Sequence, residues 1–368
     1  MRVDKLYLSG FRNFYEAGTD FSPDVNVIFG DNAQGKTNLL EAIRFLAAGK
    51  SFRERSDAAV IGFESSGFIL KADIFSGDRD QTVEISLPKG GRKTITVNGG
   101  KIKTAAGLNE RLSAVLFCPE DLSLIRGGAS RRRRLMDACI SQLRPRYAEA
   151  LSRFNRAYEC KTRILRDRLE KPSLMDALDD YSGELARAGA ELIYYRAHFV
   201  KKLAVFAQNV HREFSGGKEE LKLNYSTVKT VTDPTASPAD ILPELLEHQK
   251  AHREAEIASG LCLSGAHKDD IAVFINGREA KSFASQGQAR TASLSLKLAE
   301  REMHFSDRGE YPLLLLDDVL SELDAGRRNF VLNRISGGQV FITCCESGEI
   351  AQRTGGKLIH IENGKILE

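Results

Sequence analysis

The sequence predicts a mixed α/β fold with an inserted helical domain. The first 120 residues consist of short apolar runs separated by turn residues, a pattern typical of strands. Between Ser130 and Ser259 apolar residues recur at three- and four-residue spacing, which indicates long helices. Strand and helix patterns alternate again beyond that point. We therefore predict one domain made of residues 1–129 and 260–368, and a helical domain of residues 130–259 inserted into it.

The strands of the first domain are predicted from short apolar patterns. Val3, Leu6 and Leu8 begin a partly alternating run, and Val25–Phe29 is expected to be a buried strand that ends at a glycine. Asn98 and Gly99 are expected to form a hairpin turn, because both residues accept the positive φ that such turns need. Further strands are expected at residues 68–75, 82–87 and 94–97.

The inserted segment is predicted to consist of long helices. Leu185, Ala188 and Leu192 recur at helical spacing in a stretch without proline. The pattern breaks at the Ser-Gly-Gly of residues 215–217, and a Thr/Pro/Ser-rich loop at 230–238 leads to one more helix. After the insertion we expect strands at residues 271–275, 313–316 and 339–343 and a helix at about 286–303.

Composition excludes several classes of protein. With 42% hydrophobic and 28% charged residues, the chain has an ordinary globular composition. It has no apolar run long enough to span a bilayer, and its first residues are charged and alternating, unlike a secretory leader. The six cysteines are dispersed without a Cys-x-x-Cys pair, which favours free thiols in a reducing compartment. A secreted, membrane-embedded or zinc-finger protein is excluded, and we expect a cytoplasmic one.

A phosphate-binding loop follows the strand at residues 25–29. The segment fits the pattern G-x-x-x-x-G-K-[ST], with a buried strand before it and an apolar-periodic helix after it. Backbone N–H groups of such a loop face phosphate oxygens, the lysine neutralises the β- and γ-phosphates, and the hydroxyl binds Mg²⁺. The alternative is a glycine-rich turn that happens to contain a lysine. We predict that the loop binds a nucleoside triphosphate through Gly30, Asp31, Asn32, Ala33, Gln34, Gly35, Lys36 and Thr37.

Three further segments extend this prediction. An apolar strand at residues 313–316 ends in Asp317 and Asp318, which are suited to holding magnesium. The tetrapeptide Ser285–Gln288 opens an apolar-periodic helix, and Ser321–Asp324 follows the paired acids. The alternatives are that each tetrapeptide, taken alone, is only a helix cap, and that the acids are only a solvated strand end.

In this order, the segments resemble the heads of ABC-type ATPases. The 280 residues between Thr37 and Asp317 are too many for a transporter ATPase, and they suit the branch with helices inserted between the halves. Within that branch the sequence is similar to the RecF family of bacterial recombination mediators, related to SMC and Rad50 heads. The insertion is far too short for the long coiled coil of chromosome-structure proteins. The matching stretches are residues 8–14, 30–37, 117–122, 131–137, 264–270 and 313–324.

The resemblance implies an ATP-dependent homodimer with Mg²⁺ as cofactor. Lys36 and Thr37 of one subunit would hold a nucleotide whose γ-phosphate meets the signature of the other subunit. Thr37 and Asp317 would bind the metal ion, and Asp318 would act where relatives usually carry a catalytic glutamate. Because its side chain is one methylene shorter, we expect slow hydrolysis. The remaining nucleotide contacts would come from Ser285, Gly287, Gln288 and Asp324.

Two parts of the sequence depart from the usual ABC pattern, and a third residue, Arg12, can be interpreted in two ways. Glu120 and Asp121 stand in the mid-chain loop where a glutamine is common, and Thr343 ends the last core strand where a histidine is common. Thr343 is therefore a candidate γ-phosphate contact. Arg12 either reaches the nucleotide, as the matching arginine does in repair-type heads, or has a structural role.

Positive charge is concentrated in one stretch of the insertion. Residues 126–170 contain thirteen Lys/Arg against five Asp/Glu, whereas the whole chain nets only +3. Such a concentration is typical of contact with the phosphate backbone of DNA, which is independent of sequence and sensitive to salt. The alternatives are a solvated helix face, or pairing of Arg132 and Arg133 across a subunit interface or with nucleotide. The candidate DNA contacts are Arg131, Arg132, Arg133, Arg134, Arg144 and Arg146.

The resemblance also implies the biological role. Members of this family bind double-stranded and gapped DNA and, with RecO and RecR, promote loading of RecA in recombination, replication and the response to DNA damage. We expect a cytoplasmic, nucleoid-associated protein with weak, DNA-stimulated ATPase activity and no membrane partner. Two alternatives remain, namely the ATPase head of a Rad50-like repair nuclease complex and a transporter ATPase subunit. The segment His267–Asp270 has no second histidine at metal-ligand spacing, so we expect a structural or an inter-subunit role for it.

Overall fold

The computed structural model describes residues 1–54, 56–346 and 348–367. The chain divides into two compact units, one made of residues 1–122 and 300–368 and one of residues 123–299. These ranges differ from the predicted domains mainly at the second boundary, which lies at residues 299/300 and not at 259/260. The helix α8 (Gln286–Arg308) runs through that boundary.

The first unit contains an antiparallel sheet of six strands in the order β2-β1-β4-β5-β6-β7. The predicted turn between β6 and β7 is present, with Asn98 and Gly99 both at positive φ, 50° and 77°. Three of these strands lie where the sequence predicts strands at residues 68–75, 82–87 and 94–97. The strands are β1 (Arg2–Phe11), β2 (Phe14–Asp20), β4 (Gly67–Ser76), β5 (Arg79–Pro88), β6 (Thr94–Val97) and β7 (Gly100–Lys101).

A second, largely parallel sheet completes this unit, in the order β15-β14-β3-β13-β12-β8. Its four interior pairings from β14 to β8 are parallel, and only β15 runs antiparallel to its neighbour. The strands are β3 (Val25–Phe29), β8 (Ala114–Phe117), β12 (Leu313–Asp317), β13 (Val340–Cys344), β14 (Lys357–Glu362) and β15 (Lys365–Leu367).

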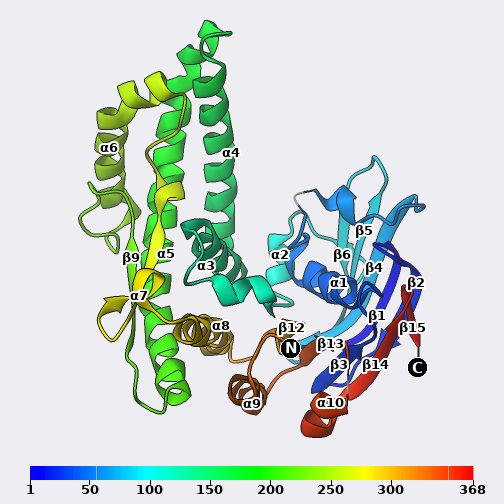
Figure 1. Cartoon of the computed structure of the whole chain (residues 1–368). Helices are drawn as coiled ribbons and strands as arrows, with labels where there is room; N and C mark the ends of the chain where they lie inside the picture. Colours follow the sequence, from blue (N-terminus) through cyan, green and yellow to red (C-terminus); the bar gives the residue numbers. More distant parts are fainter. Residues whose placement is uncertain (55, 347, 368) are drawn as a thin grey trace. The chain divides into compact units, whose positions relative to one another are not determined.

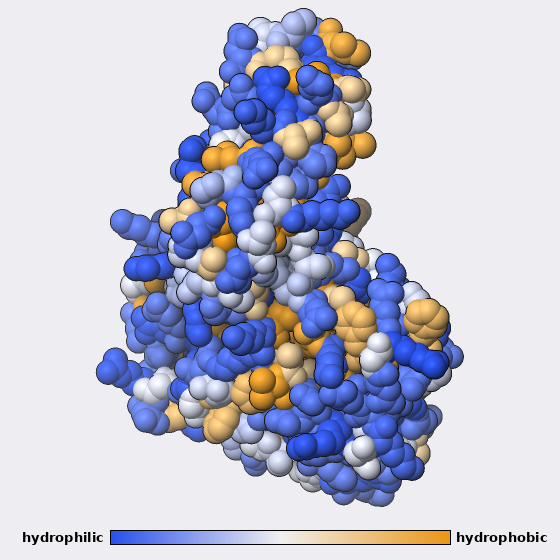
Figure 2. Space-filling view, turned by 90° about the vertical axis from the view of Figure 1, so that its left-hand side faces the viewer, coloured by the Kyte–Doolittle hydropathy of each residue, from blue (hydrophilic) through white to orange (hydrophobic). Residues whose placement is uncertain are grey.

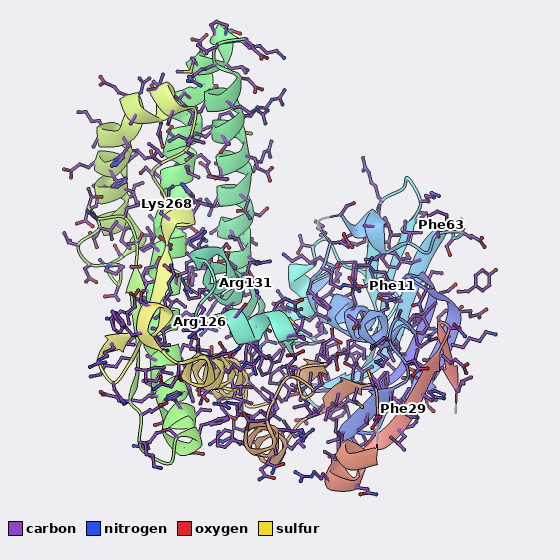
Figure 3. All side chains as sticks on the ribbon, viewed as in Figure 1. Phe11, Phe29, Phe63, Arg126, Arg131 and Lys268 are labelled. Atoms are coloured by element: carbon purple, nitrogen blue, oxygen red, sulfur yellow. The ribbon has the colours of Figure 1, made fainter. Side chains whose placement is uncertain are left out.

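The helix α1 (Lys36–Ala48) packs against both sheets (Figure 1). Its apolar residues join one buried cluster with side chains of the antiparallel sheet and of β3, β12 and β13. Phe11, Phe45 and Phe68 meet edge to face in this cluster, with ring centroids 5.4–6.1 Å apart. Figure 3 shows Phe11 beside α1. The shorter helices of the unit are α2 (Ala106–Asn109), α9 (Ala325–Arg334) and α10 (Gly348–Thr354), with 3₁₀ turns at Asp57–Val60 and Pro119–Ser123.

The second unit is mainly helical, and α5 packs between α4 and α6 (Figure 1). As predicted, α5 ends directly before the Ser-Gly-Gly break, and α6 begins at the end of the Thr/Pro/Ser-rich loop. The helices are α3 (Ala129–Leu143), α4 (Pro145–Asp167), α5 (Leu178–Phe214), α6 (Pro238–Ser259) and α7 (Ala280–Phe283), with 3₁₀ turns at Pro172–Ala177 and Ala266–Lys268.

A three-stranded sheet in this unit explains the shifted boundary. The strand β9 (Leu221–Ser226) pairs antiparallel with β10 (Asp270–Ile275), and β11 (Arg278–Glu279) pairs with the other edge of β10. The sequence patterns predict a strand at β10 but none at β9. Because the six residues of β9 hold β10 in the helical unit, residues 260–299 pack with the insertion.

None of the described helices is long and apolar enough to cross a membrane. On the face seen in Figure 2, hydrophobic side chains occur in scattered groups among hydrophilic ones.

Candidate nucleotide site and basic helix

The phosphate loop leaves the carboxyl end of β3 and enters α1, as predicted. Gly30 and Gly35 have φ values of 147° and 122°, which side chains other than hydrogen rarely allow. A Cβ at Gly30 would lie 2.3 Å from the carbonyl oxygen of Ile361, and one at Gly35 would lie 2.8 Å from the amide nitrogen of Asn13. Gly30 therefore requires glycine for close packing as well as for backbone conformation, whereas Gly35 requires it for backbone conformation, because its near contact is only the end of the Asn13 side chain.

The ammonium group of Lys36 is buried inside this loop. Its Nζ donates to the carbonyl oxygens of Gly30 at 2.6 Å and Asp31 at 2.8 Å. These contacts hold the positive charge at the centre of the loop, where the start of α1 adds its own favourable field for anions. The loop thus presents a fixed cation to a phosphate group.

Parallel pairing brings the predicted metal ligands to this loop. Because β12, β13 and β3 are neighbours in register, Asp317 lies opposite Thr343, and Thr343 opposite Ile28. The hydroxyl of Thr37 donates to Oδ1 of Asp317 at 2.9 Å. Ligand sites in parallel sheets characteristically lie at such carboxyl ends of the strands.

Thr343 organises the two acids. Its Oγ1 lies 2.9 Å from Oδ1 of Asp317 and accepts the backbone N–H of Asp318 at 2.8 Å. Asp318 has φ 49°, a left-handed conformation that aspartate tolerates better than most residues. In the structure Thr343 therefore shapes the acidic pair, a role that the sequence comparison with ABC heads did not indicate.

Asp317 and Thr37 fit a magnesium ion. Burial raises the pKa of Asp317, the hydrogen bonds from Thr37 and Thr343 lower it, and the neighbouring Asp318 charge raises it. A buried carboxylate beside a hydroxyl offers the hard oxygen ligands that Mg²⁺ prefers, and the cation would relieve the cost of burying the charge. When bound, Mg²⁺ supplies charge neutralisation at the β- and γ-phosphates.

The rim of the loop is braced by residues that the sequence did not single out. Nδ2 of Asn13 donates to the carbonyl oxygen of Gln34 at 2.8 Å. In the turn between β14 and β15, the N–H of Asn363 donates to the Gln34 side chain at 2.6 Å and that of Gly364 to its carbonyl at 3.0 Å. An Asn-Gly pair is a turn signal, so the hairpin was open to prediction.

Arg12 is bound by carboxylates. It donates to both oxygens of the buried Glu41, at 2.8 and 2.9 Å, and to Glu54 at 3.2 Å. The hydrogen bond to Glu41 raises the pKa of Arg12, against the opposing effect of burial. Of the two interpretations of Arg12, these contacts favour the structural one.

The mid-chain loop gives Asp121 a local role. Its carboxylate accepts the backbone N–H of Cys118 at 3.1 Å, which closes the 3₁₀ turn after β8. On the other side of the acidic pair, Asp324 caps α9 by accepting the N–H of Arg327 at 3.0 Å. Ser321, which lies between Asp318 and Asp324 in the sequence, donates to the carbonyl oxygen of Asp318 at 2.7 Å.

The signature tetrapeptide opens α8 with a reciprocal cap. The N–H of Ser285 donates to Oε1 of Gln288 at 2.9 Å, and the N–H of Gln288 donates to Oγ of Ser285 at 3.1 Å. This is the capping-box pattern, in which two end residues satisfy each other's backbone groups. The signature residues belong to the second unit, whereas the phosphate loop belongs to the first.

The basic stretch separates into buried and exposed arginines. Arg132 is buried and binds both oxygens of Asp270, at 2.6 and 2.8 Å, and Arg133 donates to the carbonyl oxygen of Asp269 at 2.7 Å. These two predicted DNA contacts therefore have partners inside their own unit, and we propose neither Arg132 nor Arg133 as a DNA contact. Figure 3 labels Arg126, which precedes α3, and Arg131, which lies in the first turn of α3. The exposed members of the predicted set are Arg134, Arg144 and Arg146.

The segment His267–Asp270 has a structural role, one of the two expected of it. Asp269 is fully buried and accepts hydrogen bonds from Arg196 and Thr227, both at 2.7 Å. Burial raises its pKa, while Arg196 opposes that rise. Arg196 also binds Asp137, so this network ties α3 and α5 to the start of β10.

Comparisons with known proteins agree with this arrangement. A family model described as the RecF/RecN/SMC N terminal domain matches residues 2–365. The DNA replication and repair protein RecF of Acetivibrio thermocellus is 35% identical over 361 residues, 98% of each chain. That of Lactobacillus johnsonii is 40% identical over 373 residues, covering 100% of this chain and 99% of the relative.

Solved structures give the same result. A structure of the recombination mediator protein RecF-ATPrS in the RecFOR pathway has a TM-score of 0.91 at 32% identity, covering 99% of this chain and 97% of that chain. An SMC head bound to the C-winged helix domain of ScpA has a TM-score of 0.57 at 14% identity, covering 100% of this chain and 97% of that chain, and it shows the fold alone. The predicted fold class, an α/β ATPase head with an inserted helical domain, is confirmed.

Proposed function

The chain belongs to the RecF/RecN/SMC N-terminal domain family, and from this premise we propose that ATP closes two copies of it into a dimer on DNA. It is a DNA replication and repair protein with an ABC-type ATPase head. The full-length similarity to RecF supports neither the nuclease-complex head nor the transporter subunit. The proposed dimer and its DNA contacts rest on the geometry of the site and on the basic helix.

The observation that carries the proposal is the hydrogen bond between Thr37, which follows Lys36 at the start of α1, and Asp317 at the carboxyl end of β12. Lys36 binds the β- and γ-phosphates, and Thr37 and Asp317 hold Mg²⁺. Asp318 orients the attacking water. Because its carboxylate is short and also accepts a hydrogen bond from Ser321 at 3.1 Å, we propose slow hydrolysis that releases the dimer.

The γ-phosphate is contacted by Ser285, Gly287 and Gln288 of the second copy. The N-terminal turn of α8 supports this role, because a helix start carries N–H groups and a partial positive charge that attract phosphate. In a two-fold dimer each copy supplies one phosphate loop and one signature, so two nucleotides are bound between the copies. Asp324, after the acidic pair, completes the proposed nucleotide contacts.

The DNA contacts are proposed for Arg131, Arg134, Arg144 and Arg146. Arginine binds phosphate without reading bases, so affinity is independent of sequence and falls with salt. A related structure, named as that of a recombination mediator in the RecFOR pathway, supports RecR, with RecO, as proposed partners. The proposed outcome, RecA loading on gapped DNA, rests on the resemblance to the RecF family. We further propose that the protein works in the cytoplasm, associated with the nucleoid.

Sedimentation velocity tests the proposal directly. The protein is run with Mg²⁺ and ATP, with ADP or without nucleotide, each with and without a gapped duplex and the matching intact duplex. Lys36→Arg, which keeps the charge but changes the donor geometry, is the control. We expect a shift from monomer to dimer with ATP only, a DNA signal that moves with the dimer, and no shift for the variant. A monomer that hydrolyses ATP under every condition would contradict the proposal.

A further inference from the structure

The side chain of Gln288 is held at both ends of its amide. Oε1 accepts the backbone N–H of Ser285 at 2.9 Å, and Nε2 donates to Oε1 of Glu219 at 2.8 Å. Glu219 lies between the end of α5 and the start of β9, far from the signature in sequence. The signature glutamine therefore depends on a residue of the helical insertion for its orientation.

Glu219 is itself oriented by a buried histidine. Its Oε2 lies 3.0 Å from Nε2 of His211, in the last turn of α5, and Nδ1 of that ring lies 3.2 Å from Oγ of Ser295. Burial lowers the pKa of His211, against the opposing effect of Glu219. A neutral ring that donates from Nε2 to the carboxylate leaves Nδ1 as an acceptor, which the hydroxyl of Ser295 fills only by sharing the proton that it donates to the carbonyl oxygen of Thr291 at 2.8 Å.

These contacts form a closed path. Both Gln288 and Ser295 lie on α8, and both are connected through His211 and Glu219 to the end of α5. Two attachment points on one helix restrict its rotation as well as its position. The first turn of α8 is therefore fixed relative to α5 and β9.

We propose that Glu219, oriented by His211, is a positioning residue that holds the signature turn for contact with a nucleotide bound by a second copy of the chain. This inference rests on the proposed ATP-dependent dimer. Glu219 acts through Gln288 and does not touch nucleotide. Its removal is expected to spare nucleotide binding by the phosphate loop, which belongs to the other unit, and to impair closure.

Three substitutions distinguish this role from general stabilisation. Glu219→Leu removes both acceptor oxygens at similar volume. In Glu219→Gln the amide oxygen of the new side chain still accepts from Gln288, and its NH₂ group faces His211. The His211 ring then accepts at Nε2 and donates from Nδ1 to Ser295. Glu220→Leu is the matched control, because Glu220 is an exposed neighbour that pairs only with Lys222 among the contacts described for its side chain.

Fluorescent ATP binding, ATP-dependent dimerisation and hydrolysis are measured for each variant. For Glu219→Leu we expect an unchanged Kd for nucleotide, with dimerisation and kcat each reduced about tenfold, the cost of one hydrogen bond to a charged group. Glu219→Gln and Glu220→Leu are expected to behave like the parent protein. Gln288→Met removes the same contact from the other side, together with the proposed γ-phosphate contact of Gln288, so adding Glu219→Leu to it should cause no further loss.

The outcomes separate the inference from the proposed function. If the parent protein does not dimerise with ATP, the proposed dimer fails whatever the variants do. If the parent protein dimerises with ATP and Glu219→Leu dimerises equally well, the positioning role is wrong. It is also wrong if the losses caused by Gln288→Met and Glu219→Leu add in full in the double variant. Should Glu219→Leu not fold, Glu219→Ala takes its place, and dimerisation of that variant at the parental level contradicts the inference.

Discussion

Thr37 and Asp317 are 280 residues apart in the chain, and their side chains share a hydrogen bond of 2.9 Å. The contact is a product of strand order. With β13 between β3 and β12, Thr37 at the start of the helix that follows β3 meets Asp317, the last residue of β12, at one edge of the sheet. Thr343, on the strand between them, contacts the same carboxylate. The candidate site is thus assembled from three strand ends and one helix start.

The hydroxyl of Thr343 is expected to be required for hydrolysis more than for nucleotide binding. Thr343→Val keeps the shape but leaves the N–H of Asp318 without its acceptor, which costs about 1–3 kcal/mol of stability. We expect a kcat about tenfold lower, a raised Mg²⁺ requirement and an unchanged Kd for nucleotide measured without Mg²⁺. Thr343→Ser retains the hydroxyl and should restore both values. A valine variant with parental kcat would contradict the role.

Replacement of Asp318 by asparagine should separate closure from hydrolysis. Asparagine also tolerates the left-handed backbone at this position, so the fold is retained. Because an amide cannot accept a proton from water, we expect hydrolysis to fall by about 10²-fold or more while ATP still drives dimerisation. Sedimentation velocity and phosphate release measure the two effects. A variant that hydrolyses ATP normally would assign the water-orienting role elsewhere.

The exposed arginines should set the salt dependence of DNA binding. Substituting alanine at Arg134, Arg144 and Arg146 is expected to weaken affinity for every duplex sequence alike. The slope of log K against log salt should become shallower by about 0.9 for each arginine that contacts phosphate. Fluorescence anisotropy over a salt series measures it. A control with alanine at the exposed Arg79, Arg92 and Lys101 of the other unit removes the same charge, and an equal loss there would mean that only net charge matters.

Arg132, in the same basic run, should behave differently. Its guanidinium is buried against Asp270 and the carbonyl oxygens of residues 124, 125 and 127. Arg132→Ala leaves these groups without their donor, so we expect a loss of about 3 kcal/mol in the free energy of unfolding. Arg134→Ala should change it by less than about 0.5 kcal/mol. Urea denaturation measures both, and equal stabilities would contradict the structural assignment of Arg132.

His267 should make stability depend on pH below neutrality. Its Nε2 lies 3.1 Å from the carbonyl oxygen of Cys262, and burial lowers its pKa to about 4. In the unfolded chain the pKa is about 6.5, so between these values the unfolded state binds more protons. Stability therefore falls as pH falls from about 6.5 to about 4, by about 3 kcal/mol at most.

The matched test uses glutamine. His267→Gln keeps a donor for the Cys262 carbonyl and removes the titration, so its unfolding free energy should depend less steeply on pH in this window. His198→Gln, at an exposed position, is the control. Parallel pH profiles for His267→Gln and the parent protein would show that the histidine does not titrate as described.

Local patterns predicted the phosphate loop, its strand and helix, and the acids after β12. Each depends on a few consecutive residues whose conformations are strongly restricted. The roles of Thr343 and Arg132 were not open to this reasoning, because their partners are fixed by the fold. Asp270, which binds Arg132, is 138 residues away, and a run of four arginines gives no sign of which one is buried. The strand β9 was missed because its six residues gain their stability from β10.

The brace of the phosphate loop has a consequence for synthesis of the chain. Gln34 is synthesised early. The N–H group that its side chain accepts belongs to Asn363, which follows 329 residues later. At translation rates of about 5–20 residues per second, the loop waits tens of seconds for this partner and for the neighbouring strands β13 and β14. The rim of the phosphate loop and the sheet around β3 are therefore completed only after β13, β14 and β15 have been synthesised.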